Sequence, residues 1–345
     1  MPNGFISVII PVRNESRYIS EVLDGLLGQD YSQDKFEIIV VDGCSSDKMC
    51  EVVNDYISRY ANRVRLFSNE KLLSSAARNI GILNARGEII LIVDGHCIVG
   101  NSGMFKCVNA AFEESGADCL GRPQPLEMNG ATLLQWAIAT CRRSRLGHHP
   151  DSFIYSDVCG VVPAISVAAI YRRDVFERVG FFDESFDACE DVELNYRVDV
   201  AGLRCYFDPS VAVGYVPRST FFGLAFQMFR YGRGRIRLYR KHPDTFSIKS
   251  FGLGFFVFGL ILGFLISLLD VWFGRGWFFL AYYFTVAFYL ATVSIESVRL
   301  SILQRKLPIL FFLIPVFLTI HFSFGWGIIR ETLSKIISNK IINNN

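Results

Sequence analysis

The stretch IILIVDGHCIV, residues 89–99, decides the fold class of this chain. Its run of branched apolar residues is typical of a buried strand. The run stops at Asp94 and His96, two polar side chains that stand two positions apart, before apolar residues resume. In open sheets of alternating strands and helices, ligands bind beyond the carboxyl ends of the strands. We therefore expect Asp94 and His96 to face a binding site if the neighbouring segments build such a sheet.

Strand and helix patterns alternate on both sides of this stretch. Predicted strands cover residues 5–11, 36–41, 63–67 and 88–93. A predicted helix follows each of the first three strands: one capped by Asn14, one within 49–60 and one over 74–85. Continuously apolar strands that alternate with helices predict a mostly parallel sheet covered by helices on both faces.

Polar side chains also follow two other predicted strands. Arg13, Asn14 and Glu15 come after the first strand, and Asp42 comes after the second. Asp42 alone could form a turn or cap a helix, but three strand ends with carboxylates favour a ligand site at one edge. The first turn, PVRNES (11–16), lacks the glycines of a dinucleotide-binding loop, so a Rossmann dehydrogenase is not expected.

The composition is more apolar than that of a soluble protein. Hydrophobic residues make up 51% of the chain and charged residues 20%, whereas charged residues average about 25% in soluble domains. The net charge of +2 gives no reason to expect a nucleic-acid partner. The nine cysteines are scattered without a CxxC pair, which favours reduced thiols over disulfides or a zinc site. The first residues do not resemble a secretory signal, so the N-terminal part is expected in the cytosol.

The apolar residues concentrate in three long stretches near the C-terminus, residues 251–269, 277–294 and 307–329. About 20 apolar residues span a bilayer as a helix, so all three are predicted membrane spans. Basic residues gather in 231–243 and 298–306, which predicts that residues 1–250 face the cytosol. Further basic residues follow position 330 and conflict with three full crossings. Pro308 and Pro315 leave a kinked or re-entrant third helix open.

Four motifs together resemble a known family. They are SVIIPVRNE (7–15), VVDGCSSD (40–47), AARNIGILNARGEIILIVDGH (76–96) and CEDVELNYRV (189–198). Their order and spacing resemble the inverting, nucleotide-sugar-dependent glycosyltransferases of family 2, over roughly residues 5–245. Within that family the chain is most similar to the succinoglycan-type exopolysaccharide glycosyltransferases, which carry C-terminal membrane helices.

The resemblance implies an α/β catalytic domain with the GT-A fold, Rossmann-like with a mostly parallel sheet, followed by an all-α transmembrane region of about three helices. We expect the catalytic domain over residues 1–215, an amphipathic basic interfacial segment over 216–249 and the transmembrane region over 250–345. It also implies a hexosyltransferase that uses a nucleotide sugar, with a UDP-sugar favoured, and a divalent metal, Mn²⁺ or Mg²⁺.

The resemblance assigns donor-binding roles to the residues at the strand ends. Pro11, Arg13 and Glu15 lie where the first loop of the family meets the nucleobase. Asp42 matches a carboxylate that binds the base or the ribose, and Arg78 would lie near the nucleotide or its diphosphate. Asp94 matches the first Asp of the family's Asp-x-Asp metal motif.

His96 stands where the second Asp of that motif is expected. Magnesium prefers oxygen ligands, whereas manganese tolerates imidazole better. Three interpretations therefore stay open. His96 coordinates a softer metal together with Asp94, or it bonds to the diphosphate while Asp94 holds the ion alone, or it is a structural loop residue.

Asp191 corresponds to the catalytic base of the family. An inverting transfer needs one carboxylate that takes the proton of the acceptor hydroxyl. Its neighbour Glu190 is a candidate for the acceptor side. Asp183 and Glu184 are interpreted as helix-capping acids, since acids near a helix start are stabilised by its dipole.

The segment QMFRY (227–231) resembles the QxxRW motif of processive family members, with Tyr in place of Trp. Gln227, Arg230 and Tyr231 could bind the acceptor, or they could belong to a helix that only anchors the chain at the membrane interface. The amphipathic segment 131–147 is interpreted as a lid or a second membrane contact.

Three functions compete at this point. The first is a multi-pass cell-membrane enzyme with a cytosolic catalytic domain, which adds one sugar to a polyprenyl-linked or glycan acceptor in cell-surface polysaccharide synthesis. The second is a processive polysaccharide synthase, for which three helices are few. The third is a non-catalytic membrane scaffold, suggested only by the missing second Asp.

Overall fold

The structure is a computed structural model, and it describes residues 4–128, 130–148, 152–273 and 276–342. Two compact units are present, Met1–Glu127 with Asp151–Val216, and Met128–Pro150 with Pro217–Asn345. These units differ from the boundaries expected from the sequence, because residues 128–150 group with the C-terminal helices instead of with 1–215.

The first unit is built on an eight-stranded sheet. Its order is β3-β2-β1-β4-β8-β6-β9-β7, and a two-stranded sheet pairs β10 with β5. The strands are β1 (Ile6–Val12), β2 (Phe36–Asp42), β3 (Val64–Ser68), β4 (Ile89–Ile92), β5 (Cys97–Ile98), β6 (Cys119–Gly121), β7 (Gly160–Val161), β8 (Ala168–Arg172), β9 (Cys205–Phe207) and β10 (Gly214–Tyr215). The strands β1 to β4 pair in parallel, whereas β8 is antiparallel to β4 and β6.

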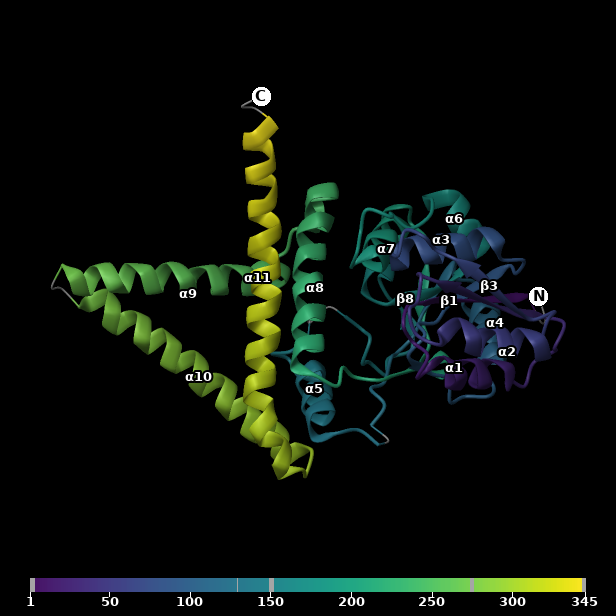
Figure 1. Cartoon of the computed structure of the whole chain (residues 1–345), viewed down its shortest axis with the longest axis horizontal. Helices are drawn as coiled ribbons and strands as arrows, with labels where there is room; N and C mark the ends of the chain where they lie inside the picture. Colours follow the sequence, from purple (N-terminus) through teal and green to yellow (C-terminus); the bar gives the residue numbers. More distant parts are fainter. Residues whose placement is uncertain (1–3, 129, 149–151, 274–275, 343–345) are drawn as a thin grey trace. The chain divides into compact units, whose positions relative to one another are not determined.

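Helices cover both faces of this sheet (Figure 1). The helices are α1 (Ile19–Leu27), α2 (Met49–Arg59), α3 (Ser74–Asn84), α4 (Met104–Ser115), α6 (Arg173–Val179) and α7 (Glu190–Val200). Successive residues of β1 point to opposite faces, so Val8 packs with α1, α2 and α4, and Ile9 packs with α3, α6 and α7. This arrangement confirms the predicted mostly parallel sheet of the GT-A type.

The helix after β1 begins later than the sequence predicted. The N-cap of α1 is Tyr18, and no side chain caps it. Asn14 instead has a left-handed backbone with φ of 57°, a conformation that Asn tolerates better than most residues. Its Oδ1 accepts a hydrogen bond from the Ser46 N–H at 2.8 Å. The predicted cap is wrong because the Asn14 side chain ties two loops together.

The second unit is helical. Its helices are α5 (Leu133–Arg143), α8 (Phe221–Lys241), α9 (Ile248–Trp272), α10 (Trp277–Leu303) and α11 (Leu310–Ile342). Three segments are long and apolar enough to cross a membrane, Ile248–Trp272, Trp277–Leu303 and Leu307–Ser334. They match the three apolar stretches of the sequence. α11 runs unbroken through Pro315, and Pro308 lies in the turn before it.

Helices α8 and α11 run side by side in this unit (Figure 1). Two glycines let their backbones approach closely. A methyl group added at Gly232 would stand 2.1 Å from the Phe324 carbonyl oxygen, and one at Gly327 would stand 2.2 Å from the Phe229 carbonyl oxygen. No side chain larger than hydrogen fits at either position, so the helices are held at close range.

Candidate functional site

The ends of three neighbouring strands bring the predicted residues to one edge of the sheet. β1 lies between β2 and β4 and is parallel to both. Asp42 is the last residue of β2, Glu15 follows the end of β1 by three residues, and Asp94 follows the end of β4 by two. The parallel pairing therefore gathers the polar loops as the sequence indicated.

Asp42 organises the loop that follows β2. Its side chain is 7% exposed and accepts hydrogen bonds from the Ser45 hydroxyl at 2.6 Å and the Ser45 N–H at 3.1 Å. The Cys50 thiol lies 3.2 Å from the second carboxylate oxygen. Burial and the Asp42 carboxylate raise the pKa of Cys50 to about 11, so this thiol stays protonated. Asp42 is thus a turn former, and both interpretations considered for it remain compatible with these bonds.

The loop after β1 is tied to the loop after β2. Besides the bond between Asn14 and Ser46, the Ser16 N–H donates to Asp47 Oδ2 at 2.9 Å. Pro11 is half-buried within β1, and Arg13 is exposed just beyond it. The two loops therefore form one rim, from which the Arg13 guanidinium is free to reach a ligand.

Glu15 and His96 form a pair across the site. His96 Nδ1 lies 3.0 Å from Glu15 Oε1, and the Tyr215 ring meets the imidazole edge to face at 5.1 Å. An ionised carboxylate can only accept a hydrogen bond, so Nδ1 carries the proton and a neutral imidazole keeps a lone pair on Nε2. Nε2 is buried and has no hydrogen-bond partner among the described residues. Glu15 thus fixes the orientation of an imidazole whose second nitrogen is available.

Arg78 lies between two carboxylates. Its Nη2 is 3.4 Å from Asp94 Oδ1, and its Nη1 is 3.1 Å from Glu190 Oε1. Burial alone would lower the pKa of Arg78, but Glu190 and Asp94 outweigh it and raise that pKa. Burial likewise opposes ionisation of Asp94, yet the charge of Arg78 lowers its pKa. Asp94 is therefore ionised, and Arg78 is fixed between both carboxylates.

Arg122 brings a second guanidinium to the surroundings of Asp94. The residue follows β6 and is 2% exposed, and its Nη2 donates to the Ile92 carbonyl at 2.9 Å. Its Nε and Nη1 are buried and have no hydrogen-bond partner in the part of the chain that the structure describes. Burial lowers the pKa of Arg122, while Asp94 and its other acidic neighbours oppose that shift. Unpartnered N–H groups of a buried cation are costly, which is typical of a site that awaits an anion.

Asp191 lies in the first turn of α7. Its neighbour Glu190 is 7% exposed and faces Arg78, whereas Asp191 is exposed, with Oδ1 2.8 Å from the Val192 N–H. Burial raises the pKa of Glu190, and Arg78 opposes this shift. The two adjacent acids thus differ in environment, and Asp191 is the one that a reactant in solution can reach.

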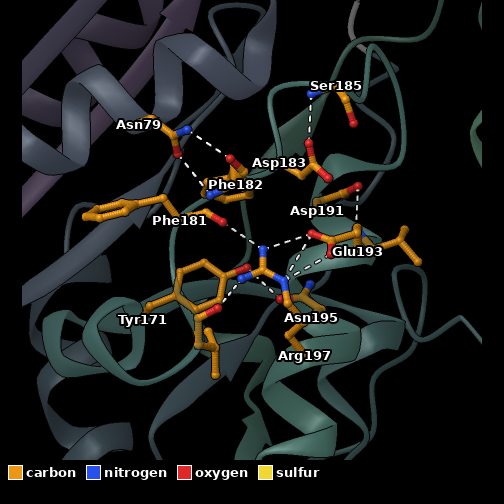
Figure 2. A network of polar contacts seen from close by, with 12 residues as sticks. Asn79, Tyr171, Phe181, Phe182, Asp183, Ser185, Asp191, Glu193, Asn195 and Arg197 are labelled. Carbon is orange, nitrogen blue, oxygen red and sulfur yellow. Dashed lines mark hydrogen bonds and ion pairs between the residues drawn. The ribbon is translucent and has the colours of Figure 1, made fainter. Parts of the chain in front are cut away.

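A polar network holds the start of α7 in place (Figure 2). Glu193 is fully buried, and it pairs with Arg197 through bonds of 3.0, 3.2 and 2.8 Å. Arg197 also donates to the carbonyls of Val179 and Phe181 in the preceding loop. This pair therefore joins the helix that carries Asp191 to the loop that leads into it.

The other side of that loop is fixed by Asn79 of α3. Its amide donates to the Phe182 carbonyl and accepts from the Phe182 N–H, both at 2.9 Å (Figure 2). It also donates to Glu184 at 3.0 Å, and Lys71 pairs with the same carboxylate. Asp183 Oδ1 accepts from the Ser185 N–H at 2.8 Å. The capping interpretation of Asp183 and Glu184 is wrong, because α7 begins at Glu190 and both acids serve the preceding loop.

We expect Arg197→Met to destabilise this unit by about 3 kcal/mol, because it leaves the Glu193 charge buried without its partner. The melting midpoint of the purified full chain, followed by intrinsic fluorescence, should fall by roughly 6 °C or more. The matched control is Arg59→Met on α2, whose guanidinium forms an exposed pair with Asp55 and should matter by less than about 1 kcal/mol. Equal melting midpoints for both variants would contradict the view that the Glu193–Arg197 pair clamps α7 to the preceding loop.

A family model described as "Glycosyltransferase like family 2" matches residues 2–234. The chain belongs to glycosyltransferase family 2. The family was expected from the four motifs, and the match confirms it over about two thirds of this glycosyltransferase.

Named relatives extend over most of the glycosyltransferase. Glycosyltransferase AglE of Haloferax volcanii is 29% identical over 266 residues, which cover 77% of this chain and 81% of AglE. Succinoglycan biosynthesis protein ExoA of Rhizobium meliloti is 29% identical over 237 residues, 68% of this chain and 70% of ExoA. The similarity to ExoA confirms the expected likeness to succinoglycan-type enzymes.

A third relative spans almost the whole chain. It is the Methanococcus voltae dolichyl N-acetyl-alpha-D-glucosaminyl phosphate 3-beta-D-2,3-diacetamido-2,3-dideoxy-beta-D-glucuronosyltransferase, 27% identical over 342 residues, 95% of this chain and 98% of the relative. Among solved structures, the mannosyltransferase PcManGT from Pyrobaculum calidifontis, in complex with GDP-Man and Mn²⁺, superposes with a TM-score of 0.57 at 17% identity. That superposition covers 96% of this chain and 88% of PcManGT, and it confirms the fold.

The motif residues Gln227, Arg230 and Tyr231 lie on α8 in the second unit. Gln227 is 8% exposed, and its amide lies 3.3 Å from the Tyr231 hydroxyl. Arg142 of α5 donates to Gln227 Oε1 at 3.5 Å. Gln227 therefore helps to join α8 to α5 in this glycosyltransferase, with Tyr231 bonded to it, whereas Arg230 lies over the Phe226 ring of the same helix. An acceptor role for the three residues stays a prediction.

Sequence reasoning missed two parts of the site. Glu193 and Arg197 have the i, i+4 spacing of a helical ion pair, so the pattern was available in CEDVELNYRV. Arg122 directly follows the short apolar run CLG (119–121), which resembles the other strand ends. A strand of three residues is too short for periodicity to reveal, so nothing in the pattern distinguished Arg122.

Proposed function

We propose that this family 2 glycosyltransferase is a membrane-anchored inverting enzyme, with its catalytic unit in the cytosol, that transfers one sugar from a nucleotide-sugar donor to a lipid-linked or glycan acceptor. The observation that carries the proposal is the arrangement around Arg78. Exposed Asp191 adjoins Glu190, and Arg78 connects Glu190 to the strand-end carboxylate Asp94. Arg78 thus lies between the acid pair of α7, where an acceptor would bind, and the strand end at Asp94, where a diphosphate would bind.

Asp191 is the proposed base. Its carboxylate takes the proton of the acceptor hydroxyl as that oxygen forms a bond to C1 of the donor sugar. The bond from C1 to the diphosphate oxygen breaks on the opposite face, so the configuration at C1 inverts and the nucleoside diphosphate leaves. The clamp between Glu193 and Arg197 holds Asp191 at the start of α7 for this step.

The donor is proposed to bind across the strand ends. Arg13, Glu15 and Asp42 border the place of the base and ribose, with Pro11 shaping the first loop. Arg78 and the unpartnered N–H groups of Arg122 face the region of the diphosphate, whose negative charge grows as the bond to C1 breaks. We favour a UDP-sugar because of the family resemblance, and the GDP-Man bound to PcManGT makes GDP-sugars the second class to test.

A divalent metal fits the residues present. Metal-binding His residues usually donate their other ring N–H to a carboxylate, and Glu15 accepts such a bond from His96 Nδ1 at 3.0 Å. The available Nε2 of His96 and the ionised Asp94 would hold the ion, and a mixed nitrogen and oxygen set suits Mn²⁺ better than Mg²⁺. Among the described residues no group of three potential ligands occurs, so diphosphate oxygens and water would complete the shell. Such an ion supplies positive charge to the leaving diphosphate.

Two other functions remain as alternatives to single addition, a processive synthase and a non-catalytic scaffold. The Methanococcus voltae relative, named for transfer to a dolichyl phosphate-linked sugar, supports a polyprenyl-linked acceptor. A non-catalytic scaffold is less well supported. Without a ligand it would gain nothing from the costly unpartnered N–H groups of Arg122, from the ionised Asp94 or from the exposed Asp191.

Labelled UDP- and GDP-sugars incubated with the membrane-embedded enzyme and lipid extract would test this function. We expect nucleotide release with one donor class and one added sugar per acceptor. A ladder of products would show a processive synthase instead. No release with any donor or metal would favour the scaffold.

Arg122→Met should raise the KM for the donor at least about 10-fold, because a charged hydrogen bond contributes on the order of 1.5–3 kcal/mol. Arg122→Lys should also be impaired, since an ammonium lacks the planar fork of a guanidinium. Arg59→Met serves as the control again, and the melting midpoint is measured for each variant. A folded Arg122→Met enzyme with a normal donor KM would remove Arg122 from the donor site.

A further inference from the structure

We propose that only α9 and α10 cross the bilayer, as a hairpin, and that α11 lies along the membrane surface together with α5 and α8. The inference rests on the membrane anchoring proposed above. It goes beyond that proposal because the segment Leu307–Ser334, most of which lies in α11, is itself long and apolar enough to span.

Polar groups of α5 and of the residues just after it cover the middle of α11. His321 Nε2 lies 2.8 Å from the Leu146 carbonyl, just after α5, and the Cys141 thiol lies 3.7 Å from the Leu313 carbonyl. Arg142, on the same helix as Cys141, is buried and bonds to Gln227 of α8. If α11 crossed the membrane, α5 and its Arg142 would have to enter the bilayer with it. A charged side chain at the bilayer centre costs at least about 2.5–3.5 kcal/mol.

Helix α8 packs along the C-terminal half of α11. Glu331 of α11 is 7% exposed and lies 2.8 Å from Arg233, 3.0 Å from Arg237 and 3.6 Å from Arg240. Because α8 and α11 run in the same direction, a spanning α11 would pull the N-terminal half of α8 into the membrane as well. The segment α8 has neither the apolar length nor the charge distribution of a span, and it is not one of the three candidates.

One face of α11 is exposed and apolar. Four large apolar side chains are exposed, Phe311 at 84%, Phe322 at 40%, Trp326 at 49% and Leu333 at 48%. Their spacings of 11, 4 and 7 residues place them on one face of a helix. The opposite face carries Ile320 and Glu331, which pack against α5 and α8. One face of α11 is thus covered by α5 and α8, and the opposite face presents apolar side chains that can enter the surface of a bilayer.

The hairpin behaves differently. Of the apolar windows of α9 and α10, 17% and 6% is buried inside the structure, against 33% for α11. Near its start α9 meets α11, where Gly254 packs on Ile328. In its far half Phe264 meets Tyr282 of α10, with 6.1 Å between the ring centroids, and the ribbons of α9 and α10 converge away from α11 (Figure 1). With 25 and 27 residues, both helices exceed the length that a hydrocarbon layer about 30 Å thick requires.

The tip of the hairpin suits the far side of a bilayer. Trp272 and Trp277 are 84% and 77% exposed there, and tryptophan is enriched at membrane interfaces. Asp270 is satisfied, because it accepts hydrogen bonds from the Phe278 N–H at 2.8 Å and the Phe279 N–H at 3.3 Å at the start of α10.

This topology resolves the conflict in the charge pattern. With two crossings, the basic segments 231–243 and 298–306 and the basic residues after position 330 all lie on the same side of the membrane. With three crossings, the last group would lie on the opposite side, against the preference of Lys and Arg for the cytoplasmic side.

Epitope tags at residue 1, between residues 274 and 275, and after residue 345 test the inference in the full chain. Proteinase K is added outside sealed cells, and each tag is followed by immunoblot. We expect only the tag between 274 and 275 to be lost, with both terminal tags lost only after permeabilisation. A matched control carries an added membrane span between residue 345 and the tag, which should bring that tag outside.

Terminal tags on opposite sides would overturn the proposal, as would all three tags on the same side. Two external termini with an internal loop would keep the hairpin and contradict only the cytosolic orientation. Since no outcome depends on activity, a failure of the proposed transferase function would be separate from a failure of this topology.

Discussion

Asp191→Asn should reduce turnover at least about 100-fold while donor binding stays near that of the unchanged enzyme. The two side chains have almost the same shape, but an amide cannot accept the proton of the acceptor hydroxyl. Asp191 is exposed, and the ion pair of Arg78 at this end of α7 is with its neighbour Glu190. The charge of Asp191 acts on Arg78 less than those of Glu190 and Asp94. The substitution therefore removes a proton acceptor without disturbing the ion pairs near Asp94. Product formation and donor affinity, measured separately, check the result.

The control for this variant is Asp174→Asn. Asp174 lies in the first turn of α6 as Asp191 lies in the first turn of α7, so both substitutions remove the same favourable charge from a helix start. The control should keep its turnover. If Asp191→Asn keeps it as well, Asp191 is not the base, and Glu190 becomes the next carboxylate to examine.

Asp94→Ala should abolish metal-dependent donor binding, since it removes the one carboxylate of the protein that is proposed to hold the ion. His96→Asp restores the usual pair of the family and should shift the metal preference from Mn²⁺ towards Mg²⁺, because a hard oxygen replaces a borderline nitrogen. Titration of both metals, with donor binding as the readout, separates this result from its alternatives.

A contact between His96 and the diphosphate alone predicts another outcome for His96→Asp. Donor binding should then weaken by charge repulsion, and the metal preference should stay unchanged. A variant that changes neither property would make His96 a structural residue. Glu15→Gln is the companion variant, because an amide at this position can donate to Nδ1 and release the tautomer that Glu15 fixes. Glu15→Gln should weaken Mn²⁺ binding if His96 coordinates the metal, and it should have little effect if His96 is a structural residue.

The fold could be predicted because its signals are local and periodic. The strand that ends at Asp94 is continuously apolar, and the three strands before it are separated by helices with one apolar face. These features leave few arrangements other than a parallel sheet with ligands at one edge. The short strands β6 to β9 carry no such signal, and Arg122 and the antiparallel half of the sheet were therefore missed.

The individual side chains of the site were predicted by type and less well by contact. Glu15 was assigned to the nucleobase, which stays a prediction, and the contact of its carboxylate with His96 was not foreseen. Asn14 was expected to cap α1, yet it binds the loop after β2. Hydrogen bonds between loops far apart in the chain depend on backbone geometry that no periodicity encodes, so a sequence identifies such residues more readily than their partners.

The placement of α5 in the second unit has a consequence for biosynthesis. Its apolar residues, such as Ile138, pack on α11, which begins at Leu310. On the ribosome the partner of α5 thus emerges roughly 170 residues later, on the order of 10–30 s at usual elongation rates. During that time the sheet can form, since all of its strands precede Pro217. The apolar face of α5 that packs on α11 is still exposed. A nascent chain stalled before α11 should consequently depend on a chaperone or on lipid to stay out of aggregates.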